Sequence, residues 1–385
     1  MIRDPETFEE LRQTVRRFVR ERLVPMERQV SEEDRVPAEL IEEMRQLGLF
    51  GLSIPDEYGG LGLTMEEEVM LAFELGGASP AFRSVFATNV GIGSQGLLMD
   101  GTPEQKAKYL PGLASGDLIG SFALTEPGAG SDAAGITTTA LRDGDSYLLN
   151  GTKRFITNAP SAGLFTVYAR TNPQIRGADG ISAFLVEAGT PGLSVGKSER
   201  KMGQQGTHVS DVIFDNCRVA ADRLLGGIEG KGFRTAMKVL DRGRLHISAF
   251  CVGVAERLLG MMTTYAMERV QFGKPIAEFQ LIQAMLADSR MEAYAGRCMV
   301  LDATRRKDAG EKITADVACC KLFTSEMVGR VADRAVQIFG GAGYIADYGV
   351  ERLYRDVRLF RIYEGTTQIQ QLLIARDIIQ AGKNS

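Results

Sequence analysis

The stretch TTTALRDGDSYLLNG, residues 137–151, decides the fold, because it has a β pattern inside a chain whose flanking regions are helical in pattern. Two dipeptides in it, Asp143-Gly144 and Asn150-Gly151, each follow a β-like run and are typical of tight hairpin turns. Further β-like runs follow at residues 164–169, 181–186 and 209–214. Since no helical pattern separates these runs, they predict an antiparallel β-barrel or sandwich and argue against a βαβ nucleotide-binding unit.

The region N-terminal to these strands has helical periodicity. Apolar residues recur at spacings of three and four in one early segment, at Phe8, Leu11, Val15 and Phe18. Thr64 with Glu67, and Thr102 with Gln105, fit the capping box that begins many helices. We therefore expect an N-terminal α-helical domain over residues 1–118.

The region after the strands is nearly free of proline. Eleven of the twelve prolines lie at or before Pro191, and only Pro275 follows. Because proline breaks helix interiors, this distribution favours long helices. Four amphipathic segments joined by short connections predict an antiparallel bundle, at residues 233–269, 278–307, 313–339 and from about 366. The expected architecture is α+β and multidomain, with a central β domain over residues 119–228 and a C-terminal four-helix bundle over residues 229–385.

Composition and charge exclude several classes of function. Lys plus Arg number 45 and Asp plus Glu 49, which gives a net charge of −4 and no electrostatic footprint for nucleic acid. The two histidines are isolated and the five cysteines form no CxxC, so we expect reduced thiols and no metal site. No apolar run of about 18 residues is present, and residues 1–10 lack the apolar core of a signal peptide. We expect a cytoplasmic protein that does not bind a membrane.

Four stretches carry residues suited to chemistry. Residues 124–132 form a glycine-rich sequence with hydroxyls that could hold an anionic or dipolar ligand, or make a simple turn. Residues 153–158 place an aromatic two positions before a threonine, which suits either stacking on a planar cofactor or a half-buried strand. Residues 337–344 are a glycine-rich break that could equally be a helix cap. The fourth stretch, residues 362–368, contains Glu364.

The setting of Glu364 admits two interpretations. A carboxylate between apolar residues and beside a glycine can be desolvated, which raises its pKa and makes it a usable general base. Alternatively, Glu364 lies in the first turn of the last helix, where the helix dipole favours a negative charge. Taken alone, the stretch favours neither interpretation.

Together, and in this order on an α–β–α frame, the stretches resemble the acyl-CoA dehydrogenase family over essentially the whole chain. The matching segments are residues 124–132, 155–157, 269–275, 337–341 and 362–371. The resemblance implies flavin-dependent α,β-dehydrogenation of an acyl-CoA thioester to the trans-2-enoyl-CoA. It also implies that FAD passes electrons to an electron-transfer flavoprotein, and that the protein is a homotetramer, a dimer of dimers.

The same resemblance implies which residues contact FAD. From the β domain these are Leu124, Thr125, Gly130, Ser131, Phe155, Ile156 and Thr157. A neighbouring subunit would contribute Arg269, Gln271, Gln337 and Gly341. Further contacts would come from Phe272, Gln280, Gly340, Thr366 and Gln368. Phe155 stands where many members of the family have a tryptophan against the flavin ring.

For catalysis, the resemblance implies that Glu364 removes the substrate's α proton while the β hydride passes to the flavin. The substrate would be contacted by Ser131, Asp241, Arg244 and Gly365. Some members carry the base immediately before this arginine, where the present chain has Gly243. Glu364 is therefore the expected base.

Arg83 bears on the choice of substrate. Residues 81–84 resemble the segment in which glutaryl-CoA dehydrogenases place an arginine against the distal carboxylate of the substrate, although Gly76 stands where that subfamily has a glutamate. The other interpretation pairs Arg83 with a carboxylate of the protein itself. The substrate thus stays open between short or medium, branched and dicarboxylyl acyl-CoA esters. A further departure from many members is Gln205, which replaces an arginine.

Two alternatives share these motifs. An acyl-CoA oxidase would differ in reacting with oxygen, and a non-catalytic member of the fold would serve as a scaffold. The negative net charge and the presence of Glu364 argue against the non-catalytic alternative.

Overall fold

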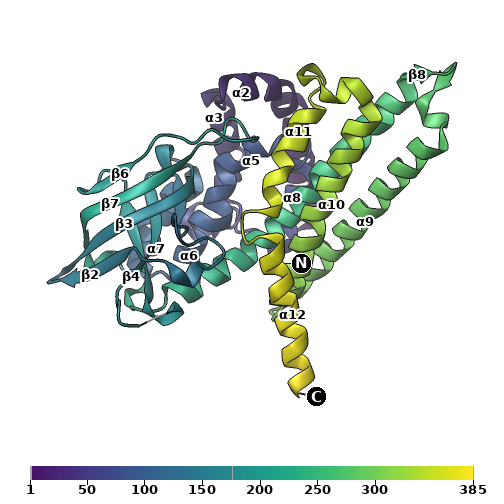
Figure 1. The fold of residues 1–385 in the computed structure, drawn as a ribbon. Helices are drawn as coiled ribbons and strands as arrows, with labels where there is room; N and C mark the ends of the chain where they lie inside the picture. Colours follow the sequence, from purple (N-terminus) through teal and green to yellow (C-terminus); the bar gives the residue numbers. More distant parts are fainter. Residues whose placement is uncertain (1, 176, 385) are drawn as a thin grey trace.

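The computed structural model describes residues 2–175 and 177–384. Helices come first along the chain, a sheet follows, and long helices complete it (Figure 1). The predicted order of α, β and α regions is therefore confirmed. The helices of the first region are α1 Pro5–Phe18, α2 Glu27–Glu33, α3 Ala38–Gln46, α4 Met65–Leu75, α5 Pro80–Ala87, α6 Gln95–Asp100 and α7 Pro103–Ser115.

Helix starts in this region follow the sequence signals. Both predicted capping boxes form, with Thr64 accepting from the N–H of Glu67 at α4 and Thr102 accepting from the N–H of Gln105 at α7. The apolar face predicted for α1 is turned inward, since Phe8, Val15 and Phe18 are buried and Leu11 is half-buried. Local sequence and packing agree throughout this region.

The middle region is one curled seven-stranded sheet with the strand order β1-β4-β2-β3-β7-β6, and β5 pairs with β4. Its strands are β1 Gly120–Ala123, β2 Thr139–Asp143, β3 Ser146–Thr157, β4 Leu164–Arg170, β5 Ile181–Glu187, β6 Leu193–Val195 and β7 Val209–Ala220. Most neighbouring strands are antiparallel, as predicted. Two pairs differ from this prediction, because β4 runs parallel to both β1 and β2.

One of the two predicted hairpin turns is correct and the other is wrong. Asp143-Gly144 begins the turn between β2 and β3, with Gly144 at φ +64°. Asn150-Gly151 instead lies inside β3, where the register with β7 shifts between Leu149 and Gly151. The dipeptide forms a β-bulge, because pairing with β7 continues on both sides of it. Gly151 is required there, since a Cβ would lie 2.4 Å from the Thr138 hydroxyl.

The C-terminal region contains the four long helices predicted from the sequence and one short helix. They are α8 Gly232–Glu268, α9 Gln280–Asp308, α10 Thr314–Phe339, α11 Val350–Val357 and α12 Thr367–Asn384. A small hairpin, β8 Val270–Gln271 with β9 Lys274–Pro275, joins α8 to α9. Helix α8 is long and apolar enough to cross a membrane, but 72% of its most apolar window is buried inside the protein. This burial is typical of a helix in the core of a bundle.

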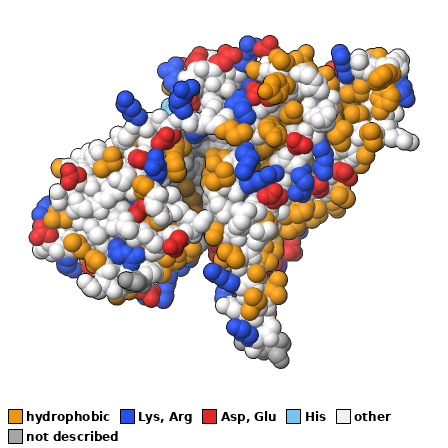
Figure 2. All heavy atoms as spheres, in the orientation of Figure 1, with side chains coloured by type: hydrophobic (Ala, Val, Ile, Leu, Met, Phe, Trp, Pro, Cys, Tyr) orange, Lys and Arg blue, Asp and Glu red, His pale blue; other side chains and the backbone are white. Residues whose placement is uncertain are grey.

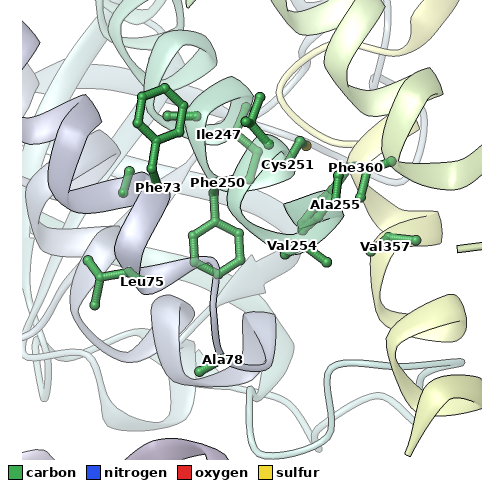
Figure 3. Packing of buried hydrophobic residues seen from close by; sticks show 14 of the residues in the cluster. Phe73, Leu75, Ala78, Ile247, Phe250, Cys251, Val254, Ala255, Val357 and Phe360 are labelled. Atoms are coloured by element: carbon green, nitrogen blue, oxygen red, sulfur yellow. The ribbon is translucent and has the colours of Figure 1, made fainter. Parts of the chain in front are cut away.

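The main core joins the first and last regions through α8. Figure 3 shows Phe73 and Leu75 of α4 beside Ile247 and Phe250 of α8, and the Phe360 ring packs edge-on against that of Phe250. Close approach of α4 and α8 depends on two facing glycines. A Cβ on Gly253 would lie 2.2 Å from the Phe73 carbonyl oxygen, and one on Gly76 would lie 2.7 Å from the Gly253 Cα.

This contact predicts different effects for two substitutions on α8. Gly253→Ala forces α4 and α8 apart and should lower the free energy of unfolding by about 1–3 kcal/mol, a typical cost of overpacking. Gly260→Ala is the matched control, because a Cβ at Gly260 meets no atom within 4 Å, so the helix should gain up to about 1 kcal/mol. Thermal unfolding of both variants measures the difference. Equal melting temperatures would show that the helices are not in contact at Gly253.

Candidate active site

A cavity of about 610 Å³ lies where the sheet meets α5, α8 and the segment before α12. The face shown in Figure 2 is hollowed between the sheet region and the C-terminal helices. The cavity brings together many of the predicted site residues: Arg83, Leu124, Thr125, Gly130, Ser131, Phe155, Ile156, Thr157, Asp241, Arg244, Glu364 and Gly365. They come from all three regions of the chain.

The glycine-rich loop after β1 is fixed by a buried ion pair that the sequence patterns did not indicate. Lys153 Nζ lies 2.7 Å from Glu126 Oε1 and also donates to the carbonyl oxygen of Leu124. Glu126 further accepts from the backbone N–H groups of Thr137 and Thr138. These bonds hold the loop so that its hydroxyls and glycines line the cavity.

The same ion pair sets the charge state of the loop. Burial opposes ionisation of Glu126, but the Lys153 ammonium and the hydrogen bonds outweigh it and lower the pKa of Glu126 to about 2. A carboxylate with a lowered pKa contributes stability above its ordinary pKa and loses it as the pH falls towards its folded-state pKa. The loop should therefore keep its conformation at neutral pH and loosen in strong acid.

Phe155 is held in a conformation that exposes its ring to the cavity. Its φ is +58°, in the left-handed region that a bulky residue rarely adopts, and 58% of the residue is exposed. The strain coincides with a register shift in β3 between Lys153 and Ile156. Ile156, by contrast, is buried, and Thr157 is half-buried beside it. An exposed aromatic in a strained position is typical of a functional site.

Glu364 lies on a strained turn that is held through its carbonyl groups. The φ angles are +54° at Glu364 and +90° at Gly365. Arg244 Nε donates to the Glu364 carbonyl oxygen at 3.0 Å, and the buried Lys321 Nζ donates to that of Gly365 at 2.6 Å. Gln370 Nε2 donates to both oxygens. The turn is therefore fixed from three helices, α8, α10 and α12.

The Glu364 side chain itself is buried and poorly partnered. Its Oε2 atom has no hydrogen-bond partner, and its Oε1 atom lies 4.0 Å from Arg83 Nη2. Burial raises the pKa of this carboxyl above its ordinary value, while the positive charges of Arg83, Lys321 and Arg244 oppose the rise. A buried carboxylate that lines a cavity and has one oxygen without a partner is well suited to accept a proton.

Models of three domains match successive parts of the chain. The acyl-CoA dehydrogenase N-terminal domain matches residues 5–117, the middle domain residues 121–217 and the C-terminal domain residues 230–379. The chain belongs to the acyl-CoA dehydrogenase family. It is an oxidoreductase that acts on acyl-CoA.

Relatives align over nearly the full length. An acryloyl-CoA reductase (NADH) from Anaerotignum propionicum is 43% identical, over 97% of this chain and 94% of the relative. An acyl-CoA dehydrogenase from Bacillus subtilis (strain 168) is 42% identical, over 96% of this chain and 97% of the relative. The solved structure of butyryl-CoA dehydrogenase from Megasphaera elsdenii is 36% identical and superposes with a TM-score of 0.94, covering 98% of this chain and 100% of that chain.

Gly243 contacts the carboxylate of Glu364. A Cβ at Gly243 would lie 2.5 Å from Glu364 Oε2. Position 243, where the resemblance implies an alternative base, thus shares its space with the Glu364 carboxylate, and a side chain there would displace Glu364.

Arg83 is buried beside the expected base. Its Nε and Nη2 atoms lie 3.3 and 3.2 Å from His246 Nδ1, and its guanidinium lies over the Phe250 ring at 5.6 Å. The carboxylate of Glu364 lies 4.0 Å from Arg83 Nη2. Asp241 is instead bound by Arg244 and Thr314. Arg83 therefore lies next to a carboxylate of the protein but does not form a hydrogen-bonded ion pair with it. Gly76 cannot carry the glutamate of the glutaryl-CoA subfamily, since it packs directly on α8.

The residues predicted to act from a neighbouring subunit gather elsewhere. A second cavity, of about 1190 Å³, is lined by Arg269, Gln271, Phe272, Gln280, Gly340 and Gly341 around the β8–β9 hairpin. It shares no lining residue with the first cavity. Gln337 is exposed one turn before this site on α10. One chain thus presents two separate halves of the predicted cofactor site.

The remaining predicted residues lie beside the first cavity without lining it. Thr366 accepts from the N–H of Ile369 at the start of α12, and Gln368 is exposed.

Gln205, which replaces an arginine of many members, accepts from Arg355 Nη1 at 3.3 Å and donates to the Lys201 carbonyl oxygen. Among residues 2–175 and 177–384 no cluster of His, Cys, Asp and Glu suited to a metal is found.

Sequence reasoning missed four residues that shape the site: Glu126, Lys153, His246 and Lys321. Glu126 and Lys153 lie in two of the stretches described above, but 27 positions apart, and no local pattern pairs them. Lys321 and His246 lie at single positions in long helices, where no local pattern distinguishes them from surface residues. Only the packing of α8 against α5 and α10 shows their roles.

Proposed function

We propose that this protein catalyses α,β-dehydrogenation of an acyl-CoA thioester to the trans-2-enoyl-CoA, with Glu364 as the general base. The observation that carries the proposal is the Glu364 carboxylate, which lines the cavity and whose buried Oε2 has no hydrogen-bond partner. A base must be ionised to act, so the raised pKa of Glu364 predicts that the rate increases with pH through that value.

The described residues fit FAD as the cofactor. Phe155 offers an exposed ring for stacking, and Thr125, Ser131 and Thr157 offer hydroxyls along the same wall of the cavity. Glycines leave room for close approach, since a Cβ at Gly130 would meet no atom within 4 Å. When bound, FAD supplies the acceptor for the β hydride of the substrate. We infer that an electron-transfer flavoprotein takes up the electrons, and that an oxygen-reactive oxidase is the alternative.

The chain's own groups would prepare the substrate for loss of a proton. The thioester α proton is weakly acidic, so its carbonyl oxygen must be polarised in the transition state. No described residue accepts from the backbone N–H of Glu364, which leaves this donor free for the thioester oxygen. Glu364 would take the proton on its carboxylate, and the apolar walls of the cavity would exclude water.

Replacement of Glu364 by glutamine tests the base. Glu364→Gln preserves the shape of the side chain and the strained turn but cannot accept the proton, so bleaching of the bound flavin by an acyl-CoA should slow by at least about 10²-fold. The measurement is anaerobic stopped-flow absorbance, with FAD content and acyl-CoA binding as controls. Bleaching at more than about a tenth of the wild-type rate would show that another group removes the proton.

We further propose a homotetramer in which the second cavity of one chain completes the first cavity of a neighbour. Large apolar side chains are exposed around the hairpin and on α9, which supports association: Val270, Phe272, Leu281, Met291 and Tyr294. The free cysteines among the described residues agree with a reducing, cytoplasmic location.

Removal of Arg269 tests the contribution of a neighbouring subunit. Arg269 lies at the second cavity and is exposed, so Arg269→Ala should loosen FAD and weaken assembly without lowering the stability of the single chain. Arg35→Ala, at an exposed arginine of the first region, is the control. FAD per chain, expected to be about one in the wild type, is measured with molar mass by light scattering. A monomer that retains stoichiometric FAD would contradict the proposed assembly.

Arg83 supports a dicarboxylyl acyl group as the substrate class. Arg83 is a buried cation on the cavity wall, and its partner in hydrogen bonding is a histidine whose low pKa leaves it neutral. A buried charge without a hydrogen-bonded counter-ion favours an anionic group on the ligand. The distal carboxylate of a short dicarboxylyl ester provides that group.

The substrate proposal predicts a preference that Arg83→Met removes. Glutaryl-CoA should react faster than pentanoyl-CoA in the wild type, by on the order of a hundredfold in kcat/KM. Arg83→Met should reverse the order, and Arg83→Lys, which keeps the charge, should retain part of the preference. An artificial electron acceptor reports the rates. Equal rates for the two esters in the wild type would rule out recognition of a distal carboxylate.

A further inference from the structure

His246 contacts Arg83 in a way that fixes the histidine's protonation. Burial, together with the positive charges of Arg83 and Arg242, lowers the pKa of His246 well below its ordinary value. The neutral ring accepts from Arg83 on Nδ1, at 3.3 Å from Nε and 3.2 Å from Nη2, so its proton is on Nε2. Nε2 is buried and has no hydrogen-bond partner. A buried donor without a partner is unfavourable for folding, which points to another role for this residue.

The position of Arg83 is unexpected for a cation beside a buried carboxylate. Its Nη2 atom lies 4.0 Å from Glu364 Oε1, whereas charge-assisted hydrogen bonds are typically about 2.7–2.9 Å. Both side chains are about nine-tenths buried, so their attraction is poorly screened. Something must hold Arg83 back from a full ion pair. The hydrogen bonds to His246 and the contact with Phe250 are the restraints that the described residues provide.

We propose that His246 is a positioning residue that holds the Arg83 guanidinium short of the Glu364 carboxylate, so that the base stays free to accept a proton. A hydrogen-bonded pair with Arg83 would stabilise the ionised form of Glu364 and make it a weaker base. The same restraint leaves the charge of Arg83 available to a ligand. The inference rests on the proposed function of Glu364 as the base.

Other charged and titratable groups around the pair do not provide this restraint. They are Arg242, Arg244 and Cys251 on α8, Lys321 on α10, and Tyr363. Arg242 is bound by the buried Glu68, while Arg244 and Lys321 hold backbone carbonyls of the strained turn. His246 is thus the group that acts on Arg83.

Two replacements of His246 distinguish the effect of its hydrogen-bond acceptor from the effect of its side-chain volume. His246→Phe fills the space but removes the acceptor, whereas His246→Asn retains an oxygen near the place of Nδ1. In His246→Phe, Arg83 should close on Glu364, and the ascending limb of the kcat/KM profile against pH should move to lower pH by about a unit or more. The plateau rate should fall at least about threefold. His246→Asn should stay close to the wild type.

A double variant identifies Arg83 as the group that His246 restrains. Adding Arg83→Met to His246→Phe removes the cation. The ascending limb of the kcat/KM profile should then return to higher pH, and the plateau rate should recover above that of His246→Phe alone. The assays use the FAD-loaded enzyme with pentanoyl-CoA, which lacks a distal carboxylate, and circular dichroism and FAD content verify folding. A His246→Phe profile identical to the wild type, or a defect that Arg83→Met does not relieve, would overturn the inference. A wild-type enzyme that does not oxidise acyl-CoA would instead overturn the proposed function.

Discussion

The strained turn at Glu364 and Gly365 is held by hydrogen bonds from side chains on three different helices to just two carbonyl oxygens. Arg244, Lys321 and Gln370 donate to these oxygens, and the backbone at both residues has a positive φ. A carboxylate on an unsupported turn of this kind would relax to a common backbone conformation. The packing of α8, α10 and α12 therefore fixes where the Glu364 carboxylate lies.

The electrostatics of the site follow from the same arrangement. Burial raises the pKa of Glu364, while three cations nearby oppose the rise, yet each cation is engaged elsewhere. Arg244 and Lys321 bind backbone carbonyls, and Arg83 binds a neutral histidine. The carboxylate thus experiences their positive potential without a short hydrogen bond to any of them. The carboxylate thus keeps Oε2 without a hydrogen-bond partner, as the general base proposed above requires.

The sequence was sufficient for the parts of the fold that local patterns control. Capping boxes at Thr64 and Thr102 and the long proline-poor helices were predicted, because caps and periodicity act over a few residues. Asn150-Gly151 was misassigned as a turn, since the same dipeptide suits a bulge when a partner strand continues past it. Glu364 could be proposed as a site residue from its motif, but the partners of Arg83 could not be predicted. His246 lies 163 positions away from Arg83, and only tertiary packing brings them together.

A short part of α8 organises the site because its side chains point in every direction around the helix. Asp241 binds Arg244, while Arg242 binds the buried Glu68 of α4. Gly243 lies against the base, and His246 binds Arg83 of α5. Successive residues of a helix are about 100° apart, so this segment can make such contacts only if neighbours surround it. The apolar composition of α8 reflects its burial among neighbouring elements. The same burial lets one helix contact the proposed base Glu364, carry Arg244 that supports its turn, and bind Arg83 through His246.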